Sequence, residues 1–359
     1  MSRLTPADLI RPEIRALSAY HVPDATGMIK LDAMENPYGW PDELIDAWLT
    51  ALRTVPLNRY PDPKARRLQA RLREAFAIPA DMALILGNGS DELIQLLILA
   101  LAGSGRAVLA PEPSFVMYRL IAGFVGMPFI AVPLRADDFN MDLAPMLAAI
   151  ERHQPALIFL AYPNNPTGNR FDARAVRQVL QATQGLVVLD EAYFPFADHS
   201  FLPSLSEFDN LLVMRTLSKM GLAGLRLGLL MGAPRWLDEF EKLRLPYNIN
   251  VLTQVSADFA LLHQTVLLEQ AGRIRAERTV LFAALNALPG VTAFPSETNF
   301  ILVRTPVGQA DRLFESLREG GILVKNLSAG GGLLRDCLRV TVGTAEENQA
   351  FLAALTAAL

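Results

Sequence analysis

The chain has 359 residues, 51% of them hydrophobic, and a formal net charge of −4 at pH 7. A chain of this length is expected to form about two domains with a large core. The mildly acidic balance, without a long basic run, argues against nucleic acid as a partner. The first residues carry scattered charges, so we expect no signal peptide. The longest apolar runs are too short to span a bilayer. Cys337 is the only cysteine, so we expect a reducing, cytoplasmic location. The four histidines lie far apart in sequence, so no metal site is expected.

The order of apolar runs predicts two domains that follow an arm. Residues 1–40 contain several prolines and are expected to form an N-terminal arm. From about 83 to 232, short apolar runs such as "ALIFLA" and "LVVLD" mostly alternate with helical patterns. This alternation is typical of a mostly parallel, doubly wound α/β sheet, here within a large domain over 41–250. A long helical region and the segments "NFILVR" and "CLRVTVGT" predict a smaller α+β domain over 251–359, with antiparallel strands.

One predicted strand ends in glycines that lead into a helix. In open α/β sheets, ligands bind outside the carboxyl ends of the strands. The segment "ALILGNGSDEL" passes from a strand through Gly87 and Gly89 into a helix that begins near Ser90. Glycines permit close backbone approach, and a helix N-terminus offers free N–H groups to a phosphate. An ordinary strand–turn–helix explains the same residues equally well.

Two further strand ends carry an amide and a carboxylate. The segment "LIFLAYPNNPTGN" ends in a turn that contains Asn165, whose amide is a possible hydrogen-bond donor to a ligand oxygen. The segment "GLVVLDEAYF" ends on Asp190, and the phenol of Tyr193 follows three residues later. Taken one at a time, a turn, a solvated carboxylate and a packing tyrosine account for these residues.

Lys219 follows another apolar strand, in the segment "TLSKMGLAGLRLG", with Arg226 seven residues further on. Lysine is almost never fully buried without a partner, so its place beside core residues calls for an explanation. Pyridoxal phosphate has a phosphate, a phenolic oxygen, a ring nitrogen and an aldehyde that condenses with lysine. One such ligand would use the phosphate cradle, the amide, the phenol, the carboxylate and the lysine together. The pattern therefore favours a pyridoxal-phosphate enzyme.

The same motifs resemble a known family. The order NNPTG, DEAY and TLSK, with an arginine shortly after, resembles the fold-type I aminotransferases. The segments "LDAMENPYG", "RYPD", "GNGSDE", "PSFVMY", "ETNFILVR" and "CLRVTVGT" resemble the histidinol-phosphate aminotransferases over nearly the full length. The resemblance implies a large domain with a mostly parallel sheet, a smaller domain and pyridoxal 5'-phosphate as cofactor.

The resemblance also implies roles in cofactor binding. Lys219 would form the Schiff base and move the proton, and Asp190 would keep the ring nitrogen protonated. Tyr193 and Asn165 would hydrogen-bond the ring hydroxyl oxygen, and Phe115 would stack on the ring. Five residues would bind the phosphate: Gly89, Ser90, Asp91, Ser218 and Arg226.

Substrate binding and assembly are implied in the same way. Arg339 would bind the substrate's carboxylate, because a bidentate guanidinium suits that group. Tyr60 of "RYPD" would reach the phosphate in the neighbouring subunit, which implies a homodimer. The other expected substrate positions are Tyr20, Asn36, Asn299 and Lys325. Two residues depart from the family pattern, since Met34 stands where asparagine is more usual and Lys325 where arginine is common.

The expected reaction is transamination between L-histidinol phosphate and 2-oxoglutarate, giving imidazole-acetol phosphate and glutamate in histidine biosynthesis. An aromatic-amino-acid aminotransferase and a threonine-phosphate decarboxylase remain alternatives, because the motifs separate them poorly. A non-enzymatic alternative is the aminotransferase-like sensor of some transcription regulators. It is disfavoured because the residues that precede "RYPD" are too few and not basic enough for a DNA-binding domain.

Overall fold

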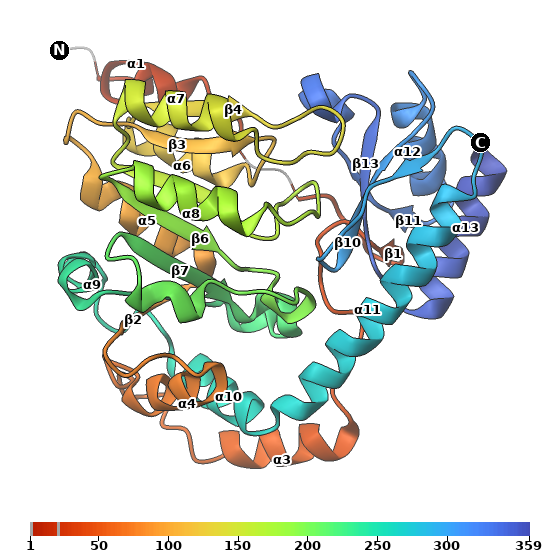
Figure 1. Ribbon diagram of the computed structural model, residues 1–359. Coiled ribbons are helices and arrows are strands. Elements are labelled where there is room, and N and C mark those ends of the chain that lie inside the picture. The colour runs from red at the N-terminus through yellow and green to blue at the C-terminus, as the bar shows by residue number, and fades with distance from the viewer. Residues whose placement is uncertain (1–2, 20–21) are drawn as a thin grey trace.

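A seven-stranded sheet forms the centre of the computed structural model, which describes residues 3–19 and 22–359 (Figure 1). Its strand order is β2-β8-β7-β6-β5-β3-β4. The pairs among β3, β4, β5, β6 and β7 are parallel, whereas β8 runs antiparallel to both β2 and β7. The strands are β2 (Ala83–Asn88), β3 (Val108–Glu112), β4 (Phe129–Pro133), β5 (Leu157–Ala161), β6 (Leu186–Asp190), β7 (Leu211–Thr216) and β8 (Leu227–Gly232). The predicted mostly parallel sheet is confirmed.

Helices cover both faces of this sheet, because its strands are apolar on both sides. Along β6, Val187 and Leu189 join one core cluster, while Leu186 and Val188 join the other. The first face is covered by α4 (Arg66–Phe76), α7 (Leu143–His153), α8 (Ala173–Ala182) and α10 (Val251–Leu262). The second face is covered by α5 (Gly89–Leu101), α6 (Met117–Val125) and α9 (Pro234–Glu241). This is the doubly wound arrangement expected from the sequence.

The C-terminal part is built on a second, smaller sheet. Its antiparallel strands are β9 (Thr292–Ala293), β10 (Phe300–Arg304), β12 (Lys325–Asn326) and β13 (Cys337–Thr341), in the order β12-β13-β10-β9. Three helices share its core cluster: α11 (Gln264–Asn286), α12 (Ala310–Glu319) and α13 (Ala345–Ala358). The expected antiparallel strands are present. Figure 1 shows α11 running from the large sheet to the small one.

The N-terminal segment contacts both parts of the molecule. The short helices α1 (Pro6–Leu9) and α2 (Pro12–Arg15) come first, and β1 (Ile29–Lys30) then pairs in parallel with β11 (Ile322–Leu323). Helix α3 (Asp42–Leu52) packs against α10, where the Trp48 indole donates a hydrogen bond to Ser256 Oγ at 2.8 Å. The division into an arm, a large domain and a small domain, with boundaries after residues 40 and 250, stays a prediction.

Within residues 3–19 and 22–359, no single helix is both long and apolar enough to cross a membrane. Helices α10 and α11 satisfy this length and composition test only when they are taken together, and they are bent by 74° relative to each other.

Candidate active site

A cavity of about 570 Å³ lies where β5, β6 and β7 end. It brings together side chains that are far apart in sequence, as expected for the carboxyl ends of parallel strands. The predicted residues that line it are Ser90, Asp91, Phe115, Asn165, Asp190, Tyr193, Ser218, Lys219 and Arg226. Met34, Ala161, Ala192 and Thr216 complete the lining.

Lys219 lies in a 3₁₀ turn (Leu217–Met220) directly after β7. Thr216 starts this turn by accepting a hydrogen bond from the Ser218 N–H, and Gly221, with φ of 110°, ends it. The Lys219 amine donates to the carbonyl of Ala33 at 3.1 Å. Burial, helped by the charge of Arg339, lowers the pKa of Lys219 to about 8. A large share of the amine is therefore neutral near pH 8, as a nucleophile or a base requires.

Asp190 is the last residue of β6, and the residue is 4% exposed. Its Oδ1 accepts from the Ala192 N–H at 3.1 Å, and its Oδ2 accepts from the Tyr118 hydroxyl at 2.7 Å. Burial raises the pKa of Asp190 to about 6, although both hydrogen bonds oppose that rise. The carboxylate is therefore ionised at neutral pH and is available to a positive group in the cavity.

A buried ion pair joins the residue that follows β6 to the end of β7. Arg215 Nη2 lies 2.8 Å from Glu191 Oε2, and both side chains are almost fully buried. The Glu191 carboxylate also accepts from Ser200 Oγ and from the Phe201 N–H. A buried pair with its remaining lone pairs satisfied is rigid. This pair therefore fixes the strand ends that carry Asp190 and Lys219.

Asn165 and Tyr193 form a second polar pair in the cavity. Asn165 Nδ2 donates to the Tyr193 hydroxyl oxygen at 3.1 Å, and that hydroxyl donates to Met34 Sδ at 3.7 Å. Burial raises the pKa of Tyr193, so the phenol is neutral and can donate a hydrogen bond. An amide and a phenol placed this way suit a ligand oxygen.

The N-terminus of α5 and Arg226 form the cationic side of the cavity. A Cβ atom built on Gly89 would lie 2.6 Å from Arg226 Nη2, so the guanidinium packs directly on the glycine. Gly228, on β8, approaches even more closely, because its Cβ would lie 2.5 Å from the carbonyl carbon of Gly89. Asp91 Oδ2 lies 3.7 Å from Arg226 Nη2, and burial raises the pKa of Asp91. Free N–H groups beside an arginine are typical of an anion site.

A wider groove of about 1650 Å³ opens beside this cavity and shares Met34, Phe115 and Asn165 with it. Three cationic side chains line the groove. Arg119 is paired with Glu112, whereas Lys325 on β12 and Arg339 on β13 are cross-strand neighbours. Arg339 Nη1 donates to Asn165 Oδ1 at 2.6 Å, and Nη2 donates to the Asp32 carbonyl at 3.0 Å. The groove thus suits an anionic ligand that reaches into the cavity.

Two other residues predicted to bind substrate, Asn36 and Asn299, line neither space. Asn36 donates to Gln270 Oε1 at 2.9 Å, and Asn299 donates to the Met34 carbonyl at 2.9 Å. Both amides therefore position the 34–36 segment. Tyr60 is 81% exposed and stacks on Tyr247, with ring centroids 4.5 Å apart. Tyr20 lies outside the described residues.

Sequence reasoning missed the role of Tyr118. Its hydroxyl contacts Asp190, and its ring is fully buried and stacks on Phe159. The available signal was the spacing from Phe115, three residues earlier and just before α6, but periodicity does not say which of the two rings faces the cavity. Phe115 lines the cavity and Tyr118 lies behind it, with the two rings 5.5 Å apart and edge to face.

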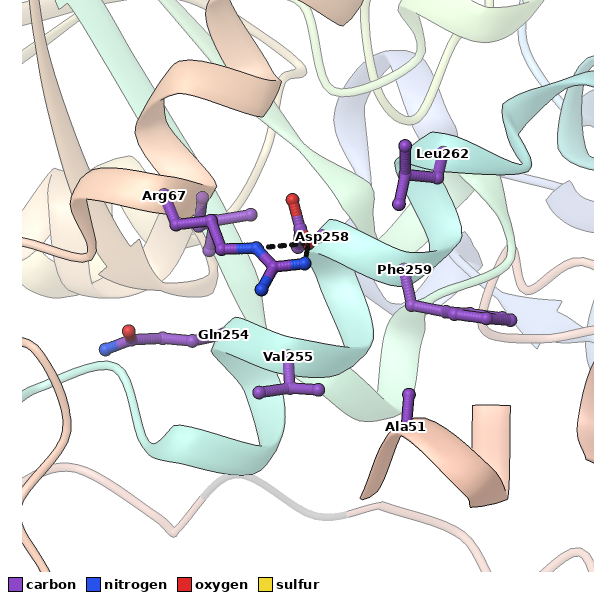
Figure 2. Close-up of a pocket in the computed structure, with 8 residues that line it drawn as sticks. Ala51, Arg67, Gln254, Val255, Asp258, Phe259 and Leu262 are labelled. Carbon is purple, nitrogen blue, oxygen red and sulfur yellow. Dashed lines mark hydrogen bonds and ion pairs between the residues drawn. The ribbon is translucent and has the colours of Figure 1, made fainter. Parts of the chain in front are cut away.

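Another hollow lies between α3, α4 and α10 (Figure 2). Its charged groups are already paired, since Asp258 Oδ2 lies 2.8 Å from Arg67 Nη2 and Asp258 Oδ1 lies 3.3 Å from Arg71 Nε. The rest of its lining is Ala51, Leu68, Gln254, Val255, Phe259 and Leu262. This hollow has no lysine or cysteine nucleophile in its lining, so we place the functional site elsewhere. Among the described residues, no cluster of His, Cys, Asp and Glu could hold a metal ion.

Residues 26–355 match the family described as aminotransferase class I and II. The chain belongs to this family. The aminotransferase is 60% identical to histidinol-phosphate aminotransferase 2 of Nitrosococcus oceani, over 98% of this chain and 97% of that protein. It is 55% identical to the histidinol-phosphate aminotransferase of Chromobacterium violaceum, over 98% of each chain.

The aminotransferase also resembles solved structures of the family. The crystal structure of a histidinol-phosphate aminotransferase from Sinorhizobium meliloti, in complex with pyridoxal-5'-phosphate, matches with a TM-score of 0.84 and 26% identity. The match covers 98% of this chain and 97% of that one. The predicted family and fold are confirmed.

Proposed function

We propose that this aminotransferase transfers an amino group between L-histidinol phosphate and 2-oxoglutarate, with pyridoxal 5'-phosphate as cofactor. The products are imidazole-acetol phosphate and glutamate. The observation that carries the proposal is the cationic groove, in which Lys325 and Arg339 lie side by side next to the cavity that holds Lys219. A phosphoester and a dicarboxylate both place an anionic group away from the reacting amine. The relatives with this name match nearly the whole chain.

The residues in the cavity fit pyridoxal phosphate. Only glycine at position 89 leaves room for the Arg226 guanidinium beside the α5 N-terminus, and this arrangement suits a phosphate. The ionised Asp190 suits a protonated ring nitrogen, and the Asn165 and Tyr193 pair suits the ring hydroxyl oxygen. Phe115 offers an aromatic face. When bound, the cofactor supplies an aldehyde that condenses with amines and a ring that withdraws electrons.

The chain's own residues divide the remaining work. Lys219, with its pKa lowered to about 8, holds the cofactor and later carries the proton of the substrate's α-carbon. Asp190 holds a proton on the ring nitrogen, because an ion pair in a buried site favours both charges. Arg226, Ser218 and the Gly89–Asp91 turn bind the phosphate. Arg339 and Lys325 bind the anionic group of the amino donor or acceptor.

We also propose that the enzyme is a homodimer with shared active sites. Tyr60 is exposed in the single chain, and its ring stacks on Tyr247. An exposed aromatic residue with a polar tip is well suited to an interface. In the dimer, Tyr60 would reach the phosphate of the cofactor in the partner subunit.

The test follows the visible absorbance of the enzyme-bound cofactor while single amino donors are added without a keto acid. Histidinol phosphate is expected to change the spectrum at far lower concentration than phenylalanine, tyrosine or threonine phosphate. The Lys325→Met variant should need about tenfold more histidinol phosphate, because a charge-assisted contact to the phosphate is lost. Its response to phenylalanine should change little.

Other outcomes would contradict the proposal. A preference for phenylalanine or tyrosine makes the protein an aromatic-amino-acid aminotransferase. Release of carbon dioxide from threonine phosphate makes it a decarboxylase. Lys219→Ala is the control, because a band that persists unchanged in this variant shows that the cofactor is held by another group.

A further inference from the structure

We propose that Tyr118 is a positioning residue that orients Asp190 and keeps it charged toward the cofactor ring. This inference rests on the proposed function, because it gives Asp190 the role of partner to the ring nitrogen. The deciding contact is the hydrogen bond from the Tyr118 hydroxyl to Asp190 Oδ2, at 2.7 Å. It joins the first turn of α6 to the end of β6, and both groups are buried.

The hydroxyl of Tyr118 is held firmly in place. The ring lies parallel to Phe159 of β5, with centroids 4.4 Å apart and an interplanar angle of 5°. Phe115 also makes an edge-to-face contact with this ring, with centroids 5.5 Å apart. Packed rings of this kind have few alternative rotamers, so the hydroxyl keeps its direction. Tyr118 therefore fixes one carboxylate oxygen, while the Ala192 N–H fixes the other.

The charge of Asp190 depends on this donor. Burial is the largest influence and favours the neutral acid, and the carboxylates of Asp91 on α5 and Glu191, directly after β6, act in the same direction. The Tyr118 hydrogen bond is the largest influence in the opposite direction, ahead of the Ala192 N–H. Tyr193 also interacts with Asp190 and is neutral, and the cationic Lys219 and Arg226 line the same cavity. Loss of the Tyr118 hydroxyl would leave Asp190 neutral over more of the physiological pH range.

The experiment measures the affinity of the cofactor-free, full-length protein for pyridoxal phosphate between pH 5.5 and 9, by fluorescence titration. Tyr118→Phe removes the hydroxyl and keeps the stacked ring. We expect this variant to bind about tenfold more weakly than the wild type at pH 7, the effect of one lost hydrogen bond to a charged group. The two proteins should converge toward pH 9, where Asp190 is ionised in both.

Tyr162→Phe is the matched control. Tyr162 is also fully buried, but its hydroxyl contacts His199 and Arg170. Its loss should leave the pH dependence of cofactor affinity unchanged. A second comparison adds Tyr118→Phe to Asp190→Asn, where it should change affinity less than about twofold because the coupled carboxylate is gone.

The inference is wrong if the ratio of affinities between Tyr118→Phe and the wild type is the same at every pH, or if the effect persists fully in the Asp190→Asn background. If the wild type itself fails to bind pyridoxal phosphate, the proposed function is wrong instead. Circular dichroism checks that each variant folds. If Tyr118→Phe does not fold, 3-fluorotyrosine is placed at position 118, because its hydroxyl is a stronger hydrogen-bond donor. Asp190 should then stay ionised to lower pH, so the loss of cofactor affinity on acidification should begin at lower pH than in the wild type.

Discussion

The reactive side chain of Lys219 lowers the stability of the folded protein at neutral pH. Its amine lies among buried groups, close enough to Arg339 and Arg226 for their charges to disfavour protonation. Its pKa of about 8 lies below the 10.5 of an ordinary lysine. The folded protein therefore releases this proton at lower pH than the unfolded chain does. At neutral pH the buried charge destabilises the protein, and this cost accompanies the reactivity.

Lys219→Met tests this cost in the cofactor-free protein. Between pH 8 and 10.5 the unfolded chain holds more protons than the folded wild type, so wild-type stability rises with pH in this window. The variant lacks the charge, so at pH 7 its Tm should be higher by about 2–4 °C. The difference should shrink as the pH rises through the window. Its transamination rate should fall by more than about a thousandfold.

Differential scanning calorimetry at several pH values measures the effect. Lys242→Met is the control, because Lys242 is exposed and paired with Glu239. It should show no comparable pH dependence. A lower Tm for Lys219→Met at pH 7 would contradict the argument.

At the scale of elements, the anion site depends on how closely β8 approaches the start of α5. Strand β8 pairs with β2 along its whole length, and Gly228 stands opposite Gly87. A side chain at 228 would collide with the backbone of Gly89 and with the N atom of Ser90. Backbone cannot give way as a flexible side chain can. The close approach therefore sets the position of the α5 N-terminus relative to Arg226.

Gly228→Ala should accordingly lower the free energy of unfolding by about 1–3 kcal/mol, the usual cost of overpacking, and weaken pyridoxal phosphate binding. Urea unfolding and a cofactor titration measure the two effects. Gly224→Ala is the matched control, since nothing lies within 4 Å of a Cβ atom at that position. If both variants showed the same free energy of unfolding and the same cofactor affinity, the close approach of Gly228 to Gly89 would not have the role given to it here.

The sequence predicted the strands and their polar ends because both signals are local. Apolar runs mark the strands; Asp190 ends one of them, and Asn165 and Lys219 come a few residues after two others. The Tyr118 contact was not predictable, because it depends on the rotation of α6 over β5 and β6. The buried amide of Asn299 was expected near the substrate, whereas it donates to the backbone at Met34. Such contacts are set by packing between distant segments, which a local pattern does not encode.

At the scale of the whole molecule, the substrate groove draws on two sheets. Arg339 comes from β13 of the small sheet, whereas Asn165 follows β5 of the large one. Tyr60 is on the surface and lies outside the cavity of its own chain. The proposed dimer would bring this residue to a neighbouring site, so each site would depend on two chains.

Mixing two inactive variants tests the shared site. Lys219→Ala leaves Tyr60 intact, and Tyr60→Ala leaves Lys219 intact. In a refolded equimolar mixture, half of the dimers are mixed and each has one complete site, so activity should reach about a quarter of the wild type. A mixture of Lys219→Ala with Asp190→Asn is the control and should gain nothing, because both residues serve the site of their own chain. No gain in the first mixture would argue against a Tyr60 contribution across the interface.

The 2.6 Å hydrogen bond from Arg339 to Asn165 has a consequence for selectivity. The arginine of the groove already has an internal acceptor, so an incoming anion that takes this N–H replaces an amide oxygen rather than water. The net gain on binding is the difference between two hydrogen-bonded states. A bidentate carboxylate or phosphate improves on a single amide, whereas a small ion such as chloride does not. Asn165 thus competes with small anions for one N–H group of Arg339.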